Sequence, residues 1–272
     1  MRPNRVRQLL EAGDLAVTAW LSTGSPYTAE VLGHCGYDAV AVDLQHGMFG
    51  VDSAIACLQA VSSTPAVPLV RCRSNDAEDI GHLLDAGAYG VICPAVDTAD
   101  AAARFVAACR YPPTGRRSFG PARGLLYGGR DYLDHADSTV LAIAMIESLD
   151  AVEALDDIVA VDGLDAVYVG PNDLAVAGGY EMLGENLPTS PLAEVLKHVV
   201  DRSRAAGRPA GIFAPTAEQA VLFQSWGYQL IAPGNDVGLL RAEAGRRIDV
   251  LRQARAGTSA RLTSSPPSVT SP

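Results

Sequence analysis

Lysine is nearly absent from this chain of 272 residues, which contains only Lys197. That residue lies in the middle of a segment with helical periodicity, so it does not end an apolar strand. An enzyme that binds a carbonyl substrate as a Schiff base needs a lysine amine at the reacting centre. The sequence therefore argues against Schiff-base chemistry.

Long apolar runs, excess positive charge and a dinucleotide-binding motif are also missing. No apolar run approaches the roughly 20 residues of a membrane span. The apolar stretch at residues 6–10 is too short for the central region of a signal peptide. The formal net charge of −10 argues against nonspecific binding to nucleic acid or acidic membranes. No Gly-x-Gly-x-x-Gly motif follows the first strand-like run.

Cysteine is sparse and shows no pairing pattern. The five cysteines are odd in number, scattered and without a Cys-x-x-Cys pair: Cys35, Cys57, Cys72, Cys93 and Cys109. This usage is typical of reduced, mostly buried thiols, and we expect a cytoplasmic protein.

Short apolar runs alternate with helix-like segments along the chain. Eight runs indicate buried strands, at residues 15–21, 39–42, 67–70, 90–93, 142–146, 166–169, 209–213 and 229–232. Helical periodicity separates several of them, at residues 77–85, 98–109, 151–161, 191–206 and 216–226. This order predicts an α/β protein with a (β/α)8 TIM barrel, rather than an open doubly wound sheet, in a single domain of residues 1–256.

Two stretches stand outside the repeat. Residues 111–132 are long and rich in Gly, Arg and Pro, which indicates a functional loop or an interface element. Residues 257–272 are rich in Ser, Thr and Pro with few apolar side chains, and we expect a disordered tail there.

Polar residues cluster where the predicted strands end. Active sites of (β/α)8 barrels lie at the C-terminal ends of the strands. The residues at these positions are Asp43, Gln45, His46, Arg71, Glu147, Asn172 and Asp173. They include two possible metal ligands, one cation and an Asp/His pair.

Glu147 and Asp173 follow two consecutive predicted strands. Neighbouring strands lie about 4.8 Å apart, so both carboxylates could bind one hard divalent cation. Each residue also has a simpler interpretation: Glu147 as a surface carboxylate at a strand-to-helix turn, and Asp173 as a helix N-cap. Their pairing on adjacent strands favours the metal site.

The other polar residues suggest chemistry beside a carbonyl group. Arg71 is placed to stabilise a developing oxyanion; it could also form a structural ion pair with one of the acids, and the two roles are compatible. His46 follows Asp43 by three residues, and an Asp neighbour can hold one tautomer of the ring. Free amides at a helix start near Asn172 and Asp173 suit a carboxylate. This set suits a 2-oxo acid whose enolate is stabilised by a metal and an arginine.

The same residues lie in motifs that resemble the HpcH/HpaI family of metal-dependent pyruvate aldolases over residues 9–244. The motifs are Asp43-Leu44-Gln45-His46-Gly47, Val70-Arg71, Leu84-Asp85-Ala86-Gly87-Ala88, Pro94, Arg110-Tyr111-Pro112-Pro113-Thr114-Gly115, Ile146-Glu147, Val169-Gly170-Pro171-Asn172-Asp173-Leu174 and Gly234-Asn235-Asp236.

The resemblance implies a barrel of the phosphoenolpyruvate/pyruvate-binding type, often hexameric or a trimer of dimers, with the last helix exchanged between subunits. It implies that Glu147 and Asp173 bind Mg, Mn or Co. Arg71 would polarise the keto oxygen of the substrate, and His46, with Asp43, would act as acid and base through a water.

Further substrate contacts follow from the same resemblance. Backbone amides near Asn172 and Asp173 would take the substrate carboxylate, and Arg117 would contribute to a site completed at a subunit interface. Independently of the resemblance, the positions of Trp20 and Phe213 at strand ends make them candidates for shaping the aldehyde pocket.

Three positions depart from the family pattern. Gln45 stands where Glu is common, Met145 where Gln is common, and Ser118 where Gly is frequent. None of them is an inferred metal ligand.

The implied activity is that of a lyase similar to 4-hydroxy-2-oxo-heptanedioate and 2-keto-3-deoxy-sugar-acid aldolases. It would cleave a 4-hydroxy-2-oxo acid to pyruvate, or a pyruvate analogue, and an aldehyde through a metal-bound enolate. Alternatives are an oxaloacetate decarboxylase, an acyl-CoA lyase of the same superfamily, or a catalytically inactive 2-oxo acid binding or scaffold protein. The acyl-CoA lyase ranks lower, because no basic cluster for CoA phosphates is evident outside residues 111–130.

Overall fold

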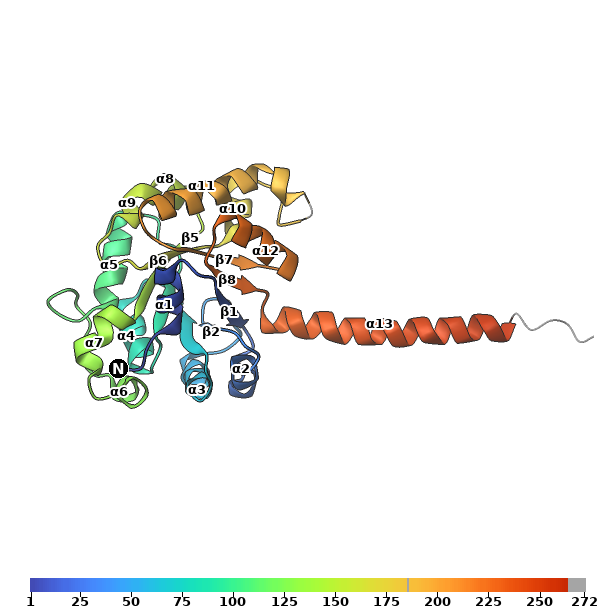
Figure 1. The fold of residues 1–272 in the computed structure, drawn as a ribbon, viewed down its shortest axis with the longest axis horizontal. Helices are drawn as coiled ribbons and strands as arrows, with labels where there is room; N and C mark the ends of the chain where they lie inside the picture. Colours follow the sequence, from blue (N-terminus) through green and yellow to red (C-terminus); the bar gives the residue numbers. More distant parts are fainter. Residues whose placement is uncertain (185, 264–272) are drawn as a thin grey trace, which may run out of the picture. The chain divides into compact units, whose positions relative to one another are not determined.

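Eight parallel strands close into a barrel in the computed structural model, which describes residues 1–184 and 186–263 (Figure 1). The strands follow one another in chain order, and the last pairs with the first. Their bounds are β1 Ala16–Leu21, β2 Ala39–Asp43, β3 Val67–Arg71, β4 Gly90–Cys93, β5 Leu141–Ile146, β6 Ala166–Val169, β7 Ala210–Ala214 and β8 Leu230–Pro233. The predicted (β/α)8 barrel is confirmed.

Helices surround the strands and connect them (Figure 1). Many begin with a side-chain cap: Thr98 caps α5 and Thr216 caps α12 by accepting backbone N–H groups. The helices are α1 Arg5–Ala12, α2 Pro26–Gly33, α3 Val51–Ser62, α4 Ala77–Asp85, α5 Ala99–Cys109, α6 Ala122–Gly128, α7 Tyr132–Thr139, α8 Leu149–Glu153, α9 Leu155–Val159, α10 Pro171–Gly178, the 3-10 helix η1 Leu187–Thr189, α11 Pro191–Ala205, α12 Ala217–Trp226 and α13 Asp236–Thr263.

The strands alternate between two buried layers because successive side chains point to opposite faces. One core lies between strands and helices and includes Val42, Val70 and Ile146. The other fills the barrel and includes Trp20 and Tyr168. This alternation sends the last inward-facing side chains to the mouth of the barrel at the strand ends.

Helix α1 packs at the N-terminal end of the barrel, opposite the strand ends that carry the candidate residues. Val6 and Leu10 join the interior core with the first residues of several strands. The amide of Asn4, which caps α1, also donates to the backbone carbonyls of Tyr89 and Thr139 at 2.9 and 2.8 Å. Helix α1 therefore covers the end of the barrel that is opposite to the candidate residues.

The segment at residues 111–132 is not all loop, contrary to the sequence-based expectation. It contains α6, because Gly124 and Gly128 allow close packing against Tyr132. Arg123 donates to the carbonyl of Ala86 at 2.7 Å and to the hydroxyl of Ser62 at 2.8 Å. The segment thus packs against the C-terminal ends of α3 and α4, at the N-terminal end of the barrel.

Two further predictions need adjustment. Residues 151–161 form two short helices, α8 and α9, instead of one, with Ala154 in a non-helical conformation between them. Helix α13 extends to Thr263, so residues 257–263 of the expected tail have a helical backbone. The rest of that tail, residues 264–272, lies outside the described residues.

The described chain divides into one compact unit, Met1–Asp236, and a second that begins at Val237. The single domain of residues 1–256 remains a prediction. No helix in the described part of the chain is long and apolar enough to cross a membrane.

Candidate active site

The register of the barrel strands brings Asp43 and Arg71 together. The two residues pair directly across β2 and β3. Nε of Arg71 donates to Oδ1 of Asp43 at 2.8 Å, and Nη2 donates to Oδ2 at 2.6 Å. Both side chains are buried. They form a bidentate ion pair at the barrel mouth, a geometry that fixes the plane of the guanidinium.

Asp43 does not hold the imidazole of His46, contrary to the sequence-based expectation. Besides the two bonds from Arg71, its oxygens accept the indole N–H of Trp20 at 3.1 Å and the backbone N–H groups of Gln45 and His46 at 3.1 and 3.2 Å. A carboxylate offers about four lone pairs, so Asp43 has no capacity left. The turn after β2 folds the backbone, not the imidazole, onto the carboxylate.

These contacts keep Asp43 ionised. Burial by itself would raise the pKa of this carboxyl, but the hydrogen bonds and charge of Arg71 outweigh it. The hydrogen bonds from Trp20 and the amide of His46 act in the same direction. The net result is a pKa below the usual value, so Asp43 is an anchor for Arg71 and not a proton carrier.

Glu147 follows β5 and is held by a strained turn at the exit of β4. Its Oε1 accepts the backbone N–H of Ala95 at 2.8 Å. Ala95 has a φ of 53°, the one positive φ outside glycine in the described chain. A left-handed conformation costs an alanine roughly 1–2 kcal/mol. Sequence reasoning missed this residue, because glycine and not alanine signals such a conformation.

The carboxylates of Glu147 and Asp173 converge over Gly170. A Cβ at Gly170 would lie 2.9 Å from Oε2 of Glu147 and 3.1 Å from Oδ2 of Asp173. Since both distances are measured from one point, the two oxygens are at most 6.0 Å apart. No group of three or more His, Cys, Asp or Glu suited to a metal occurs among the described residues. A cation bound here would therefore have two protein carboxylates as its ligands.

The electrostatics of Glu147 support the interpretation of Glu147 and Asp173 as a metal site. Burial raises its pKa above the usual value, and the negative charge of Asp173 adds to the rise. The N–H of Ala95, the positive charge of Arg71 and the nearby His46 oppose it. A half-buried carboxylate beside a second one is unfavourable unless a cation compensates it. The donor set, two hard oxygens under partial burial, fits a divalent metal ion.

Asp173 does not cap its helix. The N-cap of α10 is Gly170, with no side-chain capping bond, and Asp173 lies in the first turn together with Asn172. The simpler interpretation of Asp173 as an N-cap is therefore excluded. Both residues are exposed near free N–H groups at the helix start, where negative charge is favoured.

Aromatic side chains lie beneath the ion pair. Trp20 stacks on Tyr168 with ring centroids 5.4 Å apart, and Phe213 meets Trp20 edge-on at 6.0 Å. Arg71 lies over the Trp20 ring, with Cζ 4.9 Å from the centroid. Met145 places its sulfur 4.0 Å from Nη1 of Arg71. Trp20 and Tyr168 are buried, whereas Phe213 is only partly buried and can face a bound substrate.

Arg117 does not join these residues. Its fully buried guanidinium donates to Oδ1 of Asp85 at 2.7 Å and to the hydroxyl of Tyr132 at 3.0 Å. Asp85 ends α4, which runs antiparallel to the strands, so this cluster lies at the N-terminal end of the barrel. Within one chain, Arg117 is at the wrong end to contact a substrate at the mouth.

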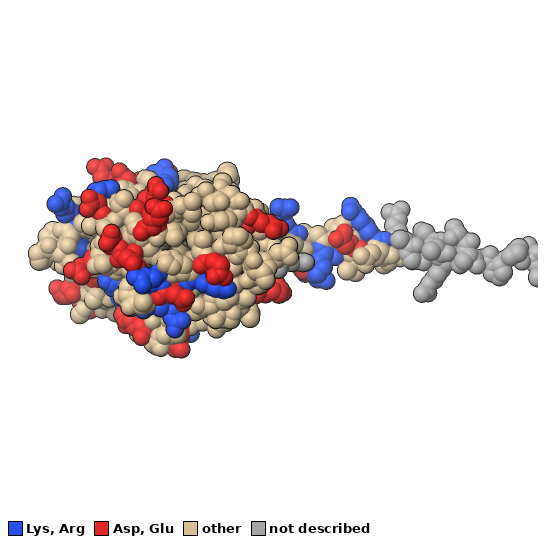
Figure 2. Space-filling view, turned by 90° about the horizontal axis from the view of Figure 1, so that it is seen from above, with Lys and Arg blue, Asp and Glu red and all other residues tan. Residues whose placement is uncertain are grey.

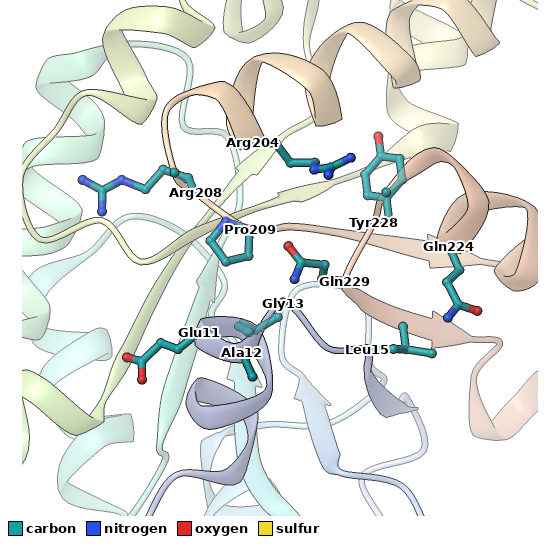
Figure 3. Close-up of a pocket in the computed structure, with 13 residues that line it drawn as sticks. Glu11, Ala12, Gly13, Leu15, Arg204, Arg208, Pro209, Gln224, Tyr228 and Gln229 are labelled. Atoms are coloured by element: carbon teal, nitrogen blue, oxygen red, sulfur yellow. The ribbon is translucent and has the colours of Figure 1, made fainter.

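A cavity of about 530 Å³ also lies at the N-terminal end (Figure 3). It is bordered by the C-terminal ends of α1, α11 and α12, near Gly13, Gly207 and Gly227. Its lining carries charges of both signs, from Glu11, Arg204 and Arg208, and it lies at the opposite end of the barrel from Arg71 and Glu147. On the face shown in Figure 2, acidic side chains are interspersed with basic ones, without a broad basic patch among the described residues.

Known proteins share this architecture and sequence. The family model for HpcH/HpaI aldolase/citrate lyase matches residues 17–242. A hydroxypyruvate/pyruvate aldolase of Rhizorhabdus wittichii is 38% identical over 93% of this chain and 99% of its own length. A 5-keto-4-deoxy-D-glucarate aldolase of Salmonella paratyphi A is 34% identical over 92% and 98%.

A solved structure agrees with these relatives. An HpcH/HpaI aldolase/citrate lyase family protein from Burkholderia cenocepacia J2315 superposes with a TM-score of 0.85 and 31% identity, over 92% of this chain and 99% of that one. The chain belongs to the HpcH/HpaI aldolase/citrate lyase family, and it is a carbon–carbon lyase of the aldolase type.

Proposed function

We propose that this lyase cleaves a 4-hydroxy-2-oxo acid to pyruvate, or a close analogue, and an aldehyde, and catalyses the reverse addition. The observation that carries the proposal is the convergence of Glu147 and Asp173 over Gly170, at the barrel end where Arg71 is anchored. The aldolase names of the relatives support the same reaction class.

A divalent cation held by Glu147 and Asp173 would act as a Lewis acid toward the keto oxygen. Arg71 stabilises the negative charge that develops on that oxygen through Nη1, the guanidinium nitrogen that does not bind Asp43. The amides of Asn172 and Asp173 bind the substrate carboxylate. Phe213 contacts the aldehyde portion.

Proton transfer is the task of His46. Its imidazole removes the proton from the 4-hydroxyl, the C3–C4 bond breaks, and the electron pair passes through C2 to the keto oxygen. The aldehyde leaves, and the protonated imidazole gives its proton to C3, which completes pyruvate and restores His46. The exposed position of His46, and its electrostatic effect on Glu147, support a place at the substrate.

Exchange of the pyruvate methyl protons in D2O, followed by NMR with Mg, Mn or Co, tests the proposal directly. We expect exchange in the wild type, its loss with a chelator, and a loss of at least about 100-fold in Glu147→Ala. Glu153→Ala, an exposed carboxylate on the neighbouring α8, is the matched control and should exchange normally. Absence of exchange and cleavage in a folded, metal-loaded protein would refute the proposal.

Decarboxylation of oxaloacetate is a second candidate, and one observation favours it. The His46 imidazole has no hydrogen-bond partner among the described side chains. No described side chain is therefore placed to pass protons to or from it. Loss of CO2 leaves the same enolate without removal of a hydroxyl proton, and so needs no such side chain.

We further propose a cytoplasmic homo-oligomer, a hexamer or trimer of dimers. Five free cysteines, four of them buried, support a reducing compartment. Helix α13 exposes Leu239, Leu240 and Ile248 at 44%, 69% and 46%, an apolar surface that a second copy could cover. Light scattering of the purified protein tests the assembly, and a monomer would contradict it.

A further inference from the structure

We propose that Trp20 is a positioning residue for Arg71, acting through Asp43. This inference rests on the proposed function and adds to it: the sequence suggested only that Trp20 shapes the aldehyde pocket. The side chain is 4% exposed, so it offers a substrate little surface. Its polar and aromatic contacts are instead directed at the ion pair.

The indole N–H closes the hydrogen-bond shell of Asp43. Oδ2 of this carboxylate accepts Nε1 of Trp20 at 3.1 Å and Nη2 of Arg71 at 2.6 Å. Oδ1 accepts the two backbone amides and Nε of Arg71. Without the indole, Oδ2 keeps one donor, and the carboxylate can rotate toward the amides. The bidentate ion pair that orients Arg71 would then be distorted.

The indole ring packs against one face of the guanidinium. Cζ of Arg71 lies 4.9 Å from the Trp20 centroid, within the range of a cation–π contact. Trp20 is itself held by Tyr168 and Phe213. The guanidinium is thus fixed at its edge by Asp43 and on one face by Trp20.

This arrangement leaves Nη1 as the guanidinium nitrogen that has no carboxylate partner. Nε and Nη2 are committed to Asp43, whereas Nη1 meets only the sulfur of Met145 at 4.0 Å. A thioether is a weak acceptor, so Nη1 keeps its N–H groups for a substrate oxygen. Since charge on that oxygen grows toward the transition state, misplacing Nη1 lowers kcat more than it raises KM.

Trp20→Phe is the sharpest variant, because it keeps an aromatic ring and removes the N–H. We expect kcat for pyruvate exchange to fall about 10-fold and KM to change less than about threefold. Trp226→Phe is the matched control. Trp226 is the chain's other tryptophan, on α12, where it packs against Phe223 and under Lys197. Equal kcat values in the two variants would overturn the proposal.

A double-mutant cycle separates positioning from a packing defect. If Trp20 acts through Asp43, Trp20→Phe has little further effect on kcat once Asp43→Asn is present. Independent, multiplicative losses would contradict the inference. Thermal unfolding of each variant verifies that the compared proteins are folded.

The contact can also be tested without metal or activity. In protein labelled with 15N-tryptophan, Trp226→Phe assigns the two indole N–H signals. We expect the Trp20 signal to persist in D2O longer than that of Trp226, and to move in Asp43→Asn. Rapid exchange, or no response to Asp43→Asn, refutes the contact even if Trp20→Phe does not fold. A wild type without pyruvate exchange but with a protected Trp20 signal refutes the proposed function alone.

Discussion

Residues at the barrel mouth differ in how firmly their surroundings hold them. Asp43 and Arg71 are buried and hydrogen-bonded to one another, so each has one accessible geometry. Glu147 is held by one backbone amide, and His46 by its backbone alone. The rigid residues suit charge stabilisation, which gains from preorganisation. The freer imidazole suits proton transfer, in which a group must approach and leave.

Replacing His46 should separate aldol cleavage from decarboxylation. We expect His46→Ala to slow cleavage by about 10²–10⁴-fold, because the 4-hydroxyl proton has lost its acceptor. Oxaloacetate decarboxylation should change far less, because CO2 leaves without that proton transfer. Both rates are measured on one preparation, with His82→Ala on the exposed face of α4 as control. Equal losses would place His46 in enolate formation itself.

The lowered pKa of Asp43 predicts how stability depends on pH. A carboxyl with a depressed pKa in the folded state contributes stability above its ordinary pKa of about 4. That contribution is lost as pH falls through the folded value. Asp43→Asn should therefore lower the free energy of unfolding by about 3 kcal/mol at pH 7. The difference from wild type, measured by urea denaturation, should shrink below about pH 4; a constant difference would contradict it.

At the scale of elements, loops between strands and helices complete the site. The turn after β4 carries Ala95, whose amide holds Glu147. Ser148, the N-cap of α8, donates to Oδ1 of Asp97 at 2.5 Å and so ties the exits of β4 and β5 together. The β1 exit is held in a similar way by Asp236. Side chains at the mouth are thus placed by short connections on a rigid barrel.

Asp236, at the start of α13, should be important for stability. It accepts the backbone N–H groups of Ser22 and Thr23 at 2.8 and 3.1 Å and the Thr23 hydroxyl at 2.6 Å. Asp236→Ala leaves those donors unpaired, at a cost of about 2 kcal/mol. In a domain of this size that lowers Tm by roughly 5 °C.

Calorimetry measures this effect, with Asp249→Ala on exposed α13 as control. An unchanged Tm for Asp236→Ala would show that the β1 exit does not depend on these bonds. Trp20 lies on β1, close to the exit that Asp236 holds. Asp236→Ala should therefore also lower the rate of pyruvate exchange.

For the whole molecule, burial decides which thiols react. Cys35 is exposed, and the other four cysteines are buried. Burial, together with the charge of Asp236, raises the pKa of Cys57 to about 11, and burial raises that of Cys109 to about 12. Since the thiolate is the nucleophile, we expect iodoacetamide to modify one cysteine in the native protein and five after denaturation. Mass spectrometry counts the adducts; several in the native state would contradict this packing.

The order of short apolar runs and their polar ends was sufficient to predict the barrel and most of its mouth. Strand positions follow from local composition, and the (β/α)8 rule then places Arg71, Glu147 and Asp173 at one end. An ion pair of Arg71 with one of the acids was among the alternatives, but the sequence did not identify Asp43 as that acid, because an Asp three residues before a His is equally near the ring and the backbone amides.

The sequence by itself determined the fold class and the placement of Arg71, Glu147 and Asp173 at one end of the barrel. Only the tertiary structure decided that Asp43 binds Arg71 and Trp20, that Ala95 holds Glu147, and that Arg117 lies at the opposite end. The physical reason is that strand periodicity is local, whereas hydrogen bonds across strands depend on register and on the backbone of turns. Those quantities exist only once the barrel has closed.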